Sequence, residues 1–230
     1  MRLILQIAPP ALKRRAYRFL KVRRVAAVSS HLPPQPTFGE ALPIAPAPAV
    51  LAFLARRRSA SALALAAPGP DAAQLDDLLR LAARAPDHGK LAPWRFIILA
   101  GEGKAACVAR LAALAEGRGD PGLVAKLGKL AAPPLGVVVV SSPKPGAIPQ
   151  WEQQLSAGAV CANLLNATLA MGFGGNWITD WYSYDAEALA ILGVGPGERV
   201  AGVVLIGATR EAPQERVRPE IAGLISRWEA

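Results

Sequence analysis

A short segment between residues 84 and 96 gathers several side chains that could bind a charged ligand. Arg84, His88 and Lys90 lie close together here, and prolines on both sides stiffen the backbone. The apolar run 96–99 follows directly and predicts a buried strand. Cationic groups on a rigid loop at a strand end suit a planar, polar, anionic ligand. An ordinary helix-to-strand connection with solvated charges explains the segment equally well when it is taken alone.

A second cationic group lies upstream, at Arg57, Arg58 and Ser59, where a short helix that begins near Ala49 is expected to end. Arginine presents a planar fork of donors that suits a phosphate dianion, and the serine adds a hydroxyl. Arginines that offset the dipole at a helix C-terminus are the simpler alternative. Only the combination with other features makes an anion site the better interpretation.

A glycine-rich run, Gly172–Gly175, forms the third candidate group, and Trp177, Ile178 and Thr179 follow it. Since glycine has no Cβ, its main-chain N–H groups can approach a ligand closely. Arg210 closes the last expected strand and is available for a second phosphate contact.

These groups must be positioned by a body in which helices alternate with short strands. Helices are expected over about 49–57, 71–85, 104–116, 123–131, 149–171 and 185–191, and strands over 95–100, 135–141, 176–179 and 200–207. Asp71 is the expected N-cap of the second helix. Four consecutive valines in 135–141 predict a central strand. Because no regular βαβ repeat emerges, the predicted fold class is α+β.

The long helix is apolar on nearly every side over residues 155–171. Asn163, Asn166 and Thr168 interrupt it, and it falls short of the roughly 20 apolar residues that a membrane span needs. Such a helix is normally buried in a core or at a subunit interface. We therefore expect a homodimer that packs on this helix.

The positive charge is concentrated in the N-terminal part of the 230-residue chain. Of the net charge of +9, residues 1–40 contribute +7, from eight basic residues and one acid. Residues 1–48, basic and then proline-rich, are predicted to be a flexible extension, and residues 49–230 the globular domain. The nearly neutral body argues against a nucleic-acid partner, and membrane contact is conceivable only through the arm.

Few side chains are available for metal or nucleophilic chemistry. Cys107 and Cys161 are expected to be unpaired thiols in a reducing, cytoplasmic compartment. With two histidines in the chain, no metal site is expected.

In their order along the chain, Arg57–Ser59, the 84–96 segment, Trp151–Gly158 and Gly172–Trp177 resemble the FMN-dependent nitroreductase family. The resemblance is to its compact NAD(P)H nitroreductase branch and covers about residues 49–210. It implies a central, mainly antiparallel sheet flanked by helices, and a homodimer with FMN sites at the subunit interface. It also implies that the flavin passes hydride from NAD(P)H to a small electron acceptor, nitroaromatic or quinone-like, by a ping-pong mechanism. No catalytic side chain is then required.

The resemblance also implies roles for individual residues. The expected FMN contacts are Arg57, Arg58, Ser59, Arg84, His88, Trp177, Ile178, Thr179 and Arg210. Arg84 would stabilise the reduced flavin, and His88 would reach the flavin of the neighbouring subunit. Ile178 would contact it by backbone only, because some relatives have a basic side chain there. The residues expected near the nicotinamide nucleotide are Ala167, Thr168, Leu169, Ala170, Met171 and Gly172.

The chain departs from the family pattern at two positions. Ser61 stands where Lys or Arg is frequent, and Ala92 stands where Gln is usual. Two alternatives stay open. One is a flavin-destroying or dehalogenating oxidoreductase on the same scaffold. The other is a non-catalytic flavin-binding or membrane-surface protein that acts through its basic N-terminal arm.

Overall fold

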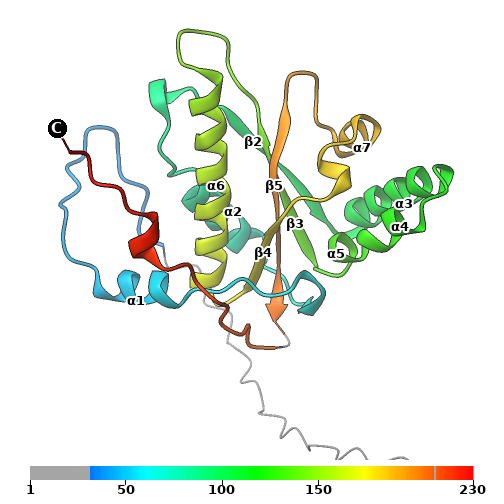
Figure 1. The fold of residues 1–230 in the computed structure, drawn as a ribbon, viewed down its shortest axis with the longest axis horizontal. Helices are drawn as coiled ribbons and strands as arrows, with labels where there is room; N and C mark the ends of the chain where they lie inside the picture. The colour runs from blue at the N-terminus through cyan, green and yellow to red at the C-terminus, as the bar shows by residue number, and fades with distance from the viewer. Residues whose placement is uncertain (1–31, 210, 230) are drawn as a thin grey trace, which may run out of the picture.

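The computed structural model describes residues 32–209 and 211–229, and a five-stranded sheet forms its centre (Figure 1). The strand order is β1-β5-β3-β2, and β4 pairs with β5 as well. The strands are β1 (Leu65–Ala66), β2 (Trp94–Ala100), β3 (Leu135–Ser141), β4 (Gly174–Ile178) and β5 (Arg199–Thr209). Every pairing is antiparallel, which confirms the α+β class and the mainly antiparallel sheet.

Helices cover both faces of the sheet, so β3 is buried on both sides. Val137 and Val139 pack against α2 (Ala72–Ala82) and α6 (Gln150–Ala170). Val138 and Val140 belong to the second core. That core includes side chains of α3 (Gly101–Gly117), α5 (Gly128–Ala131) and α7 (Ala186–Leu192), and α4 (Pro121–Lys126) packs on α3. Successive side chains of a strand point to opposite faces of the sheet. Because both faces of β3 are buried, every position must be apolar, which explains the unbroken valine run.

Local signals set several of these boundaries. Asp71 caps α2, because its carboxylate accepts a hydrogen bond of 2.8 Å from the N–H of Gln74, whose amide oxygen accepts from Asp71 N–H at 3.0 Å. The helix ends at Ala82 and not at the expected Ala85, because the residue before Pro86 disfavours helical backbone. The two-residue β1 was not predicted, since it is too short to show periodicity. Three short 3₁₀ turns complete the body: η1 (Ala62–Ala64), η2 (His88–Lys90) and η3 (Trp181–Ser183).

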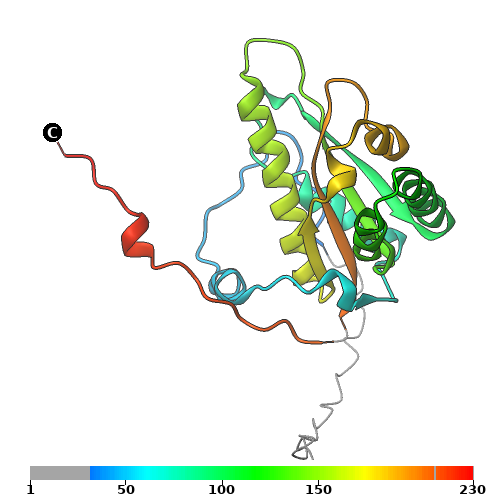
Figure 2. The same cartoon turned by 45° about the vertical axis from the view of Figure 1, so that its right-hand side comes forward.

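Two segments project from the body and leave apolar side chains uncovered (Figure 2). The helix α1 (Pro48–Arg56) buries none of its residues, and Leu51 and Leu54 are exposed. The tail 211–229 contains the turn η4 (Ile221–Leu224) and ends near Trp228, which is 88% exposed. An isolated chain would hold this apolar surface in water, which is typical of an interaction surface.

The predicted extension 1–48 falls largely outside the described residues. Its described part, up to Ala47, contains no helix or strand. In the part of the chain that the structure covers, no helix is both long and apolar enough to cross a bilayer.

Candidate functional site

The cationic group at Arg57, Arg58 and Ser59 is followed directly by a residue that is bonded to β4. The N–H of Ala60 donates to the carbonyl of Gly175 at 3.0 Å, and the side-chain amide of Asn176 donates to the carbonyl of Ala60. These bonds join the segment that follows α1 to the strand that carries Trp177. The structure therefore places the segment that carries Arg57, Arg58 and Ser59 beside Gly175 and Asn176 of the strand that leads to Trp177.

Arg57 is at the centre of an arginine cluster with unsatisfied hydrogen-bonding capacity. Its Nη2 donates to Oγ of Ser59 at 3.2 Å, but its buried Nε has no partner among the described residues. Burial lowers the pKa of Arg57, and the charges of Arg218, Arg58 and Arg216 lower it further. An anion with several acceptor oxygens would pair the free Nε–H and relieve this repulsion.

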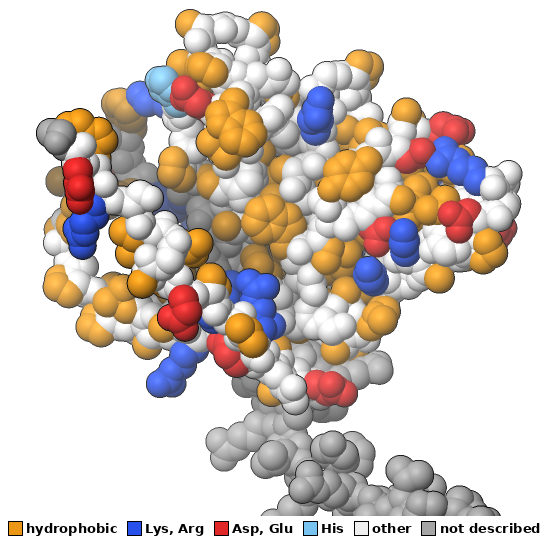
Figure 3. Space-filling model, in the orientation of Figure 1, with side chains coloured by type: hydrophobic (Ala, Val, Ile, Leu, Met, Phe, Trp, Pro, Cys, Tyr) orange, Lys and Arg blue, Asp and Glu red, His pale blue; other side chains and the backbone are white. Residues whose placement is uncertain are grey.

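The C-terminal tail contributes to this cluster. Nε of Arg58 donates to the carbonyl of Gln214 at 2.9 Å and lies 3.5 Å from a carboxylate oxygen of Glu215. The same carboxylate binds Arg218 at 3.0 Å. Figure 3 shows Lys and Arg side chains gathered at the lower edge of this face, with acidic side chains beside them. Arg216 and Arg218 were not among the predicted contacts; the available signal was a pair of arginines two residues apart in the last part of the sequence.

Three predicted contacts lie in β4 or directly after it: Trp177, Ile178 and Thr179. Their side chains point in different directions. Trp177 lies across Gly202, where any Cβ would overlap the indole, and it is 38% exposed. Ile178 packs into the core on the opposite face, which leaves only its backbone on the side of Trp177. The exposed Thr179 accepts a hydrogen bond of 2.7 Å from the hydroxyl of Tyr184. Trp177 thus shares the α6 face of the sheet with Gly175, which lies two residues before it on β4.

The glycines of β4 have a packing role that was not predicted. A Cβ on Gly174 would lie 2.6 Å from Cδ2 of Leu65, and one on Gly175 would lie 2.9 Å from Cδ1 of Leu165. Core side chains already fill the space that the missing Cβ atoms leave. The missing Cβ atoms are therefore required by the packing of the sheet, and the approach of these backbone N–H groups to a ligand stays a prediction.

The cationic segment 84–96 is held near the N-terminal end of α6. Ser156, in the second turn of that helix, donates to the carbonyl of Pro86 at 2.7 Å and so holds the loop that carries His88. Near the other end, Thr168 packs against Gly175. These two contact points are twelve residues apart, which is about 18 Å of helix. Within one chain, His88 and the arginine cluster therefore lie near opposite ends of α6.

His88 itself is well placed to meet another molecule. Its side chain is 62% exposed, and Nδ1 lies 2.6 Å from Oε2 of Glu152 on α6. The described residues contain no group of three or more side chains suited to a metal ion. Cys107 and Cys161 are both free, and burial raises the pKa of Cys161 to about 12.

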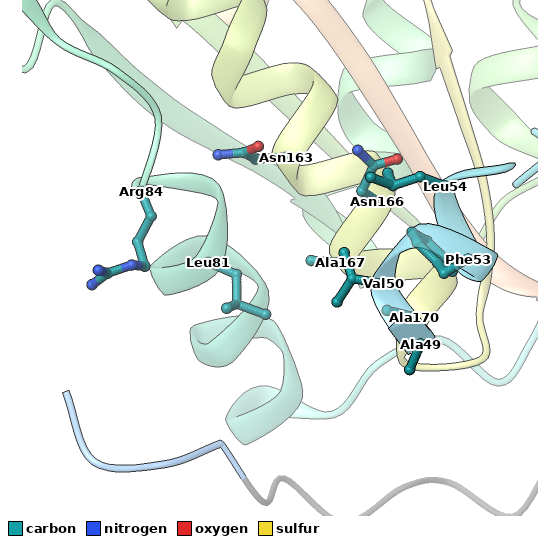
Figure 4. A pocket seen from close by; sticks show the side chains of 10 residues that line it. All are labelled: Ala49, Val50, Phe53, Leu54, Leu81, Arg84, Asn163, Asn166, Ala167 and Ala170. Atoms are coloured by element: carbon teal, nitrogen blue, oxygen red, sulfur yellow. The ribbon is translucent and has the colours of Figure 1, made fainter. Parts of the chain in front are cut away.

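A cavity of about 600 Å³ opens between α1, α2 and α6 (Figure 4). Arg84 and Leu81 lie on one side of it, the side chains of α1 lie on the other, and Asn163 and Asn166 project from α6 between them. Arg84 thus shares a cavity with α1, the helix that leads into Arg57. The lining is otherwise apolar, from residues Ala49, Val50, Phe53, Leu54, Ala167 and Ala170.

The residues predicted near the nicotinamide nucleotide do not share one face. Ala167 and Ala170 line the cavity, whereas Thr168 is fully buried against Gly175. A contact between the Thr168 side chain and a nucleotide is therefore ruled out by its burial. Leu169 and Met171 are half-buried and Gly172 is exposed, as expected of consecutive positions around a helix end. The predicted phosphate contact at Arg210 lies outside the described residues.

The chain is similar to a known family over most of its length. A family model described as "Nitroreductase family" matches residues 54–208. An Escherichia coli K12 protein named "Putative NAD(P)H nitroreductase YdjA" is 33% identical over 160 residues, which cover 68% of this chain and 86% of that protein. A Haemophilus influenzae protein with a similar name is 34% identical over 158 residues, 67% of this chain and 86% of its own.

Solved structures share the fold. A nitroreductase-like protein from Bacillus cereus superposes with a TM-score of 0.68 at 22% identity, covering 83% of this chain and all of its own. A nitroreductase with bound FMN from Bacteroides fragilis has a TM-score of 0.59 at 23% identity, over 78% of this chain and 98% of its own.

Proposed function

This chain belongs to the nitroreductase family, and from that premise we propose that it is an FMN-dependent oxidoreductase that uses NAD(P)H. The observation that carries the proposal is the arginine cluster. Arg57 offers a buried Nε–H that is unpaired among the described residues, and Arg216 and Arg218 add positive charge beside it. A phosphate dianion such as that of FMN matches this donor set in charge and in acceptor number.

The remaining side chains would orient the flavin ring. Trp177, 38% exposed on β4, would border the ring, with backbone contacts from Ile178 and Thr179. Arg84 would place a positive charge near the pyrimidine end of the ring, which favours uptake of negative charge there. When bound, FMN supplies the redox chemistry by taking hydride from NAD(P)H and passing it to an acceptor in separate half-reactions.

A second copy of the chain is part of the proposal. Within one chain, α6 keeps His88 away from the arginine cluster, so the two groups can meet only if a partner supplies one of them. The exposed leucines of α1 and the apolar lining of the cavity on α6 provide a surface for that partner. We therefore propose a homodimer with two flavin sites, each completed by His88 of the other chain.

The proposed acceptor is a small electron-poor molecule, nitroaromatic or quinone-like. Such acceptors need no nucleophile, and the buried Cys161 thiol is unsuited to be one.

We propose that residues 1–48 stand apart from the catalytic domain of residues 49–230, and that the enzyme works in the cytoplasm. The alternative, a membrane-surface protein, is favoured only by the +7 charge of residues 1–40.

The decisive experiment uses purified full-length protein mixed with FMN. We expect one tightly held FMN per chain, loss of the flavin colour on anaerobic addition of NADPH or NADH, and return of the colour with a nitroaromatic or a quinone. A protein that binds no FMN and instead binds vesicles of anionic lipid contradicts the proposal and supports the alternative.

A further inference from the structure

The η2 loop between α2 and β2 is held in a strained conformation. Gly89, Lys90 and Ala92 have φ angles of 78°, 55° and 44°, a left-handed region that disfavours residues with a Cβ. The carboxylate of Asp87 accepts hydrogen bonds from two N–H groups of the loop, that of Ala92 at 2.7 Å, and so stabilises this backbone. Strain that the surroundings maintain is typical of functional sites.

His88 extends from this loop to a carboxylate that is also firmly placed. Its Nδ1 lies 2.6 Å from Oε2 of Glu152, in the first turn of α6. The neighbouring Gln153 fixes the chain before that turn, because its Nε2 donates to the carbonyls of Lys144 and Ile148, both at 3.0 Å. Both partners of the contact therefore project from backbone that hydrogen bonds hold in place.

The contact determines which nitrogen of the imidazole carries the hydrogen. A carboxylate can only accept a hydrogen bond, so Nδ1 of His88 must donate to Glu152. In the neutral ring, Nε2 then keeps its lone pair and is an acceptor. The two side chains are 62% and 44% exposed, so the far edge of the imidazole is open to an incoming molecule.

We propose that Glu152 is a positioning residue that fixes His88 as the Nδ1–H tautomer and thereby makes Nε2 an acceptor for a donor group of the partner's flavin. Flavin offers such donors at its N3–H and at its ribityl hydroxyls. The inference rests on the proposed function, which supplies both the flavin and the second chain.

The first test needs no flavin. Replacing the other histidine, His31→Gln, leaves His88 as the only imidazole in a tag-free protein. Long-range ¹H–¹⁵N correlation spectra at about pH 9, where an ordinary imidazole is neutral, then report its tautomer. We expect Nδ1–H in this background, Nε2–H after Glu152→Ala, and no change after Gln154→Ala, the matched control on the same turn of α6. The Nε2–H form in the His31→Gln protein, or the same tautomer with and without Glu152, overturns the inference.

The second test asks whether Glu152 acts through His88. The Kd for FMN is measured by flavin fluorescence for His88→Ala, Glu152→Ala and the double variant. We expect each single change to raise Kd by about five- to tenfold, and the double variant to bind as His88→Ala does. Losses that multiply in the double variant show that Glu152 acts independently of His88 and overturn the inference. If the wild-type protein binds no flavin at all, the proposed function fails, and the tautomer measurement alone decides the role of Glu152.

Discussion

Replacing Arg57 by alanine should weaken the binding of FMN without weakening the fold. The variant removes a buried Nε–H that has no partner among the described residues and an Nη2 that is held by Ser59. One charge-assisted hydrogen bond contributes about 1.5–3 kcal/mol, so the Kd for FMN should rise about 10- to 150-fold. The ligand-free variant should be at least as stable as the ligand-free wild type. Arg218, Arg58 and Arg216, which lower the pKa of Arg57, are no longer repelled by its positive charge.

Isothermal titration with FMN and with riboflavin, which lacks the phosphate, separates the phosphate from the ring. We expect Arg57→Ala to raise the Kd for FMN and to leave the Kd for riboflavin within about twofold. The matched control is Arg56→Ala, which removes an exposed charge one residue earlier and should leave both constants unchanged. Equal losses for FMN and riboflavin would refute the assignment of Arg57 to the phosphate.

Two further predictions concern the strand that anchors the site. Gly207→Ala should lower the free energy of unfolding in urea by about 1–3 kcal/mol, because its Cβ would lie 2.8 Å from a backbone oxygen that cannot move away. The Cβ of Gly202→Ala meets only the half-exposed indole of Trp177, which can move. This variant should therefore lose less unfolding free energy than Gly207→Ala, but it should weaken FMN binding. Equal losses of unfolding free energy at the two glycines would contradict the prediction. The hydrogen bond from Arg95 lowers the pKa of Glu198 from 4.5 to about 2, so this carboxylate stabilises the fold above about pH 4.5 and the contribution is lost as the pH falls toward 2. Melting temperatures should therefore fall less steeply over this range in Glu198→Gln than in the wild type, and parallel curves would show that the ion pair adds nothing.

Local patterns in the sequence predicted the framework well. The valine run gave the central strand β3 with its observed bounds, because a strand buried on both faces must be apolar at every position. Asp71 revealed the start of α2, since capping depends on residues three apart in the chain. Arg57, Arg58 and Ser59 were selected as candidates by residue type. Only the family resemblance predicted that they lie near β4.

Long-range packing decided what the sequence did not reveal. The tail crosses Arg58 more than 150 residues later, and nothing local marks Gln214 as its contact. Gly174 and Gly175 have the composition of a ligand-binding loop, yet Leu65 and Leu165 fill the space beside them. Residue type shows that a Cβ is missing, whereas only the fold shows what takes its place.

Complementation between two defective chains tests most directly whether the flavin site is shared between protomers. One chain carries Arg57→Ala and Ser59→Ala, and the other carries His88→Ala, each with its own affinity tag. A flavin site shared between protomers predicts that the purified mixed dimer binds one FMN with wild-type affinity, since one of its two sites keeps every contact. Neither defective homodimer should do so. A mixed dimer that binds FMN no better than the two homodimers would contradict the shared site.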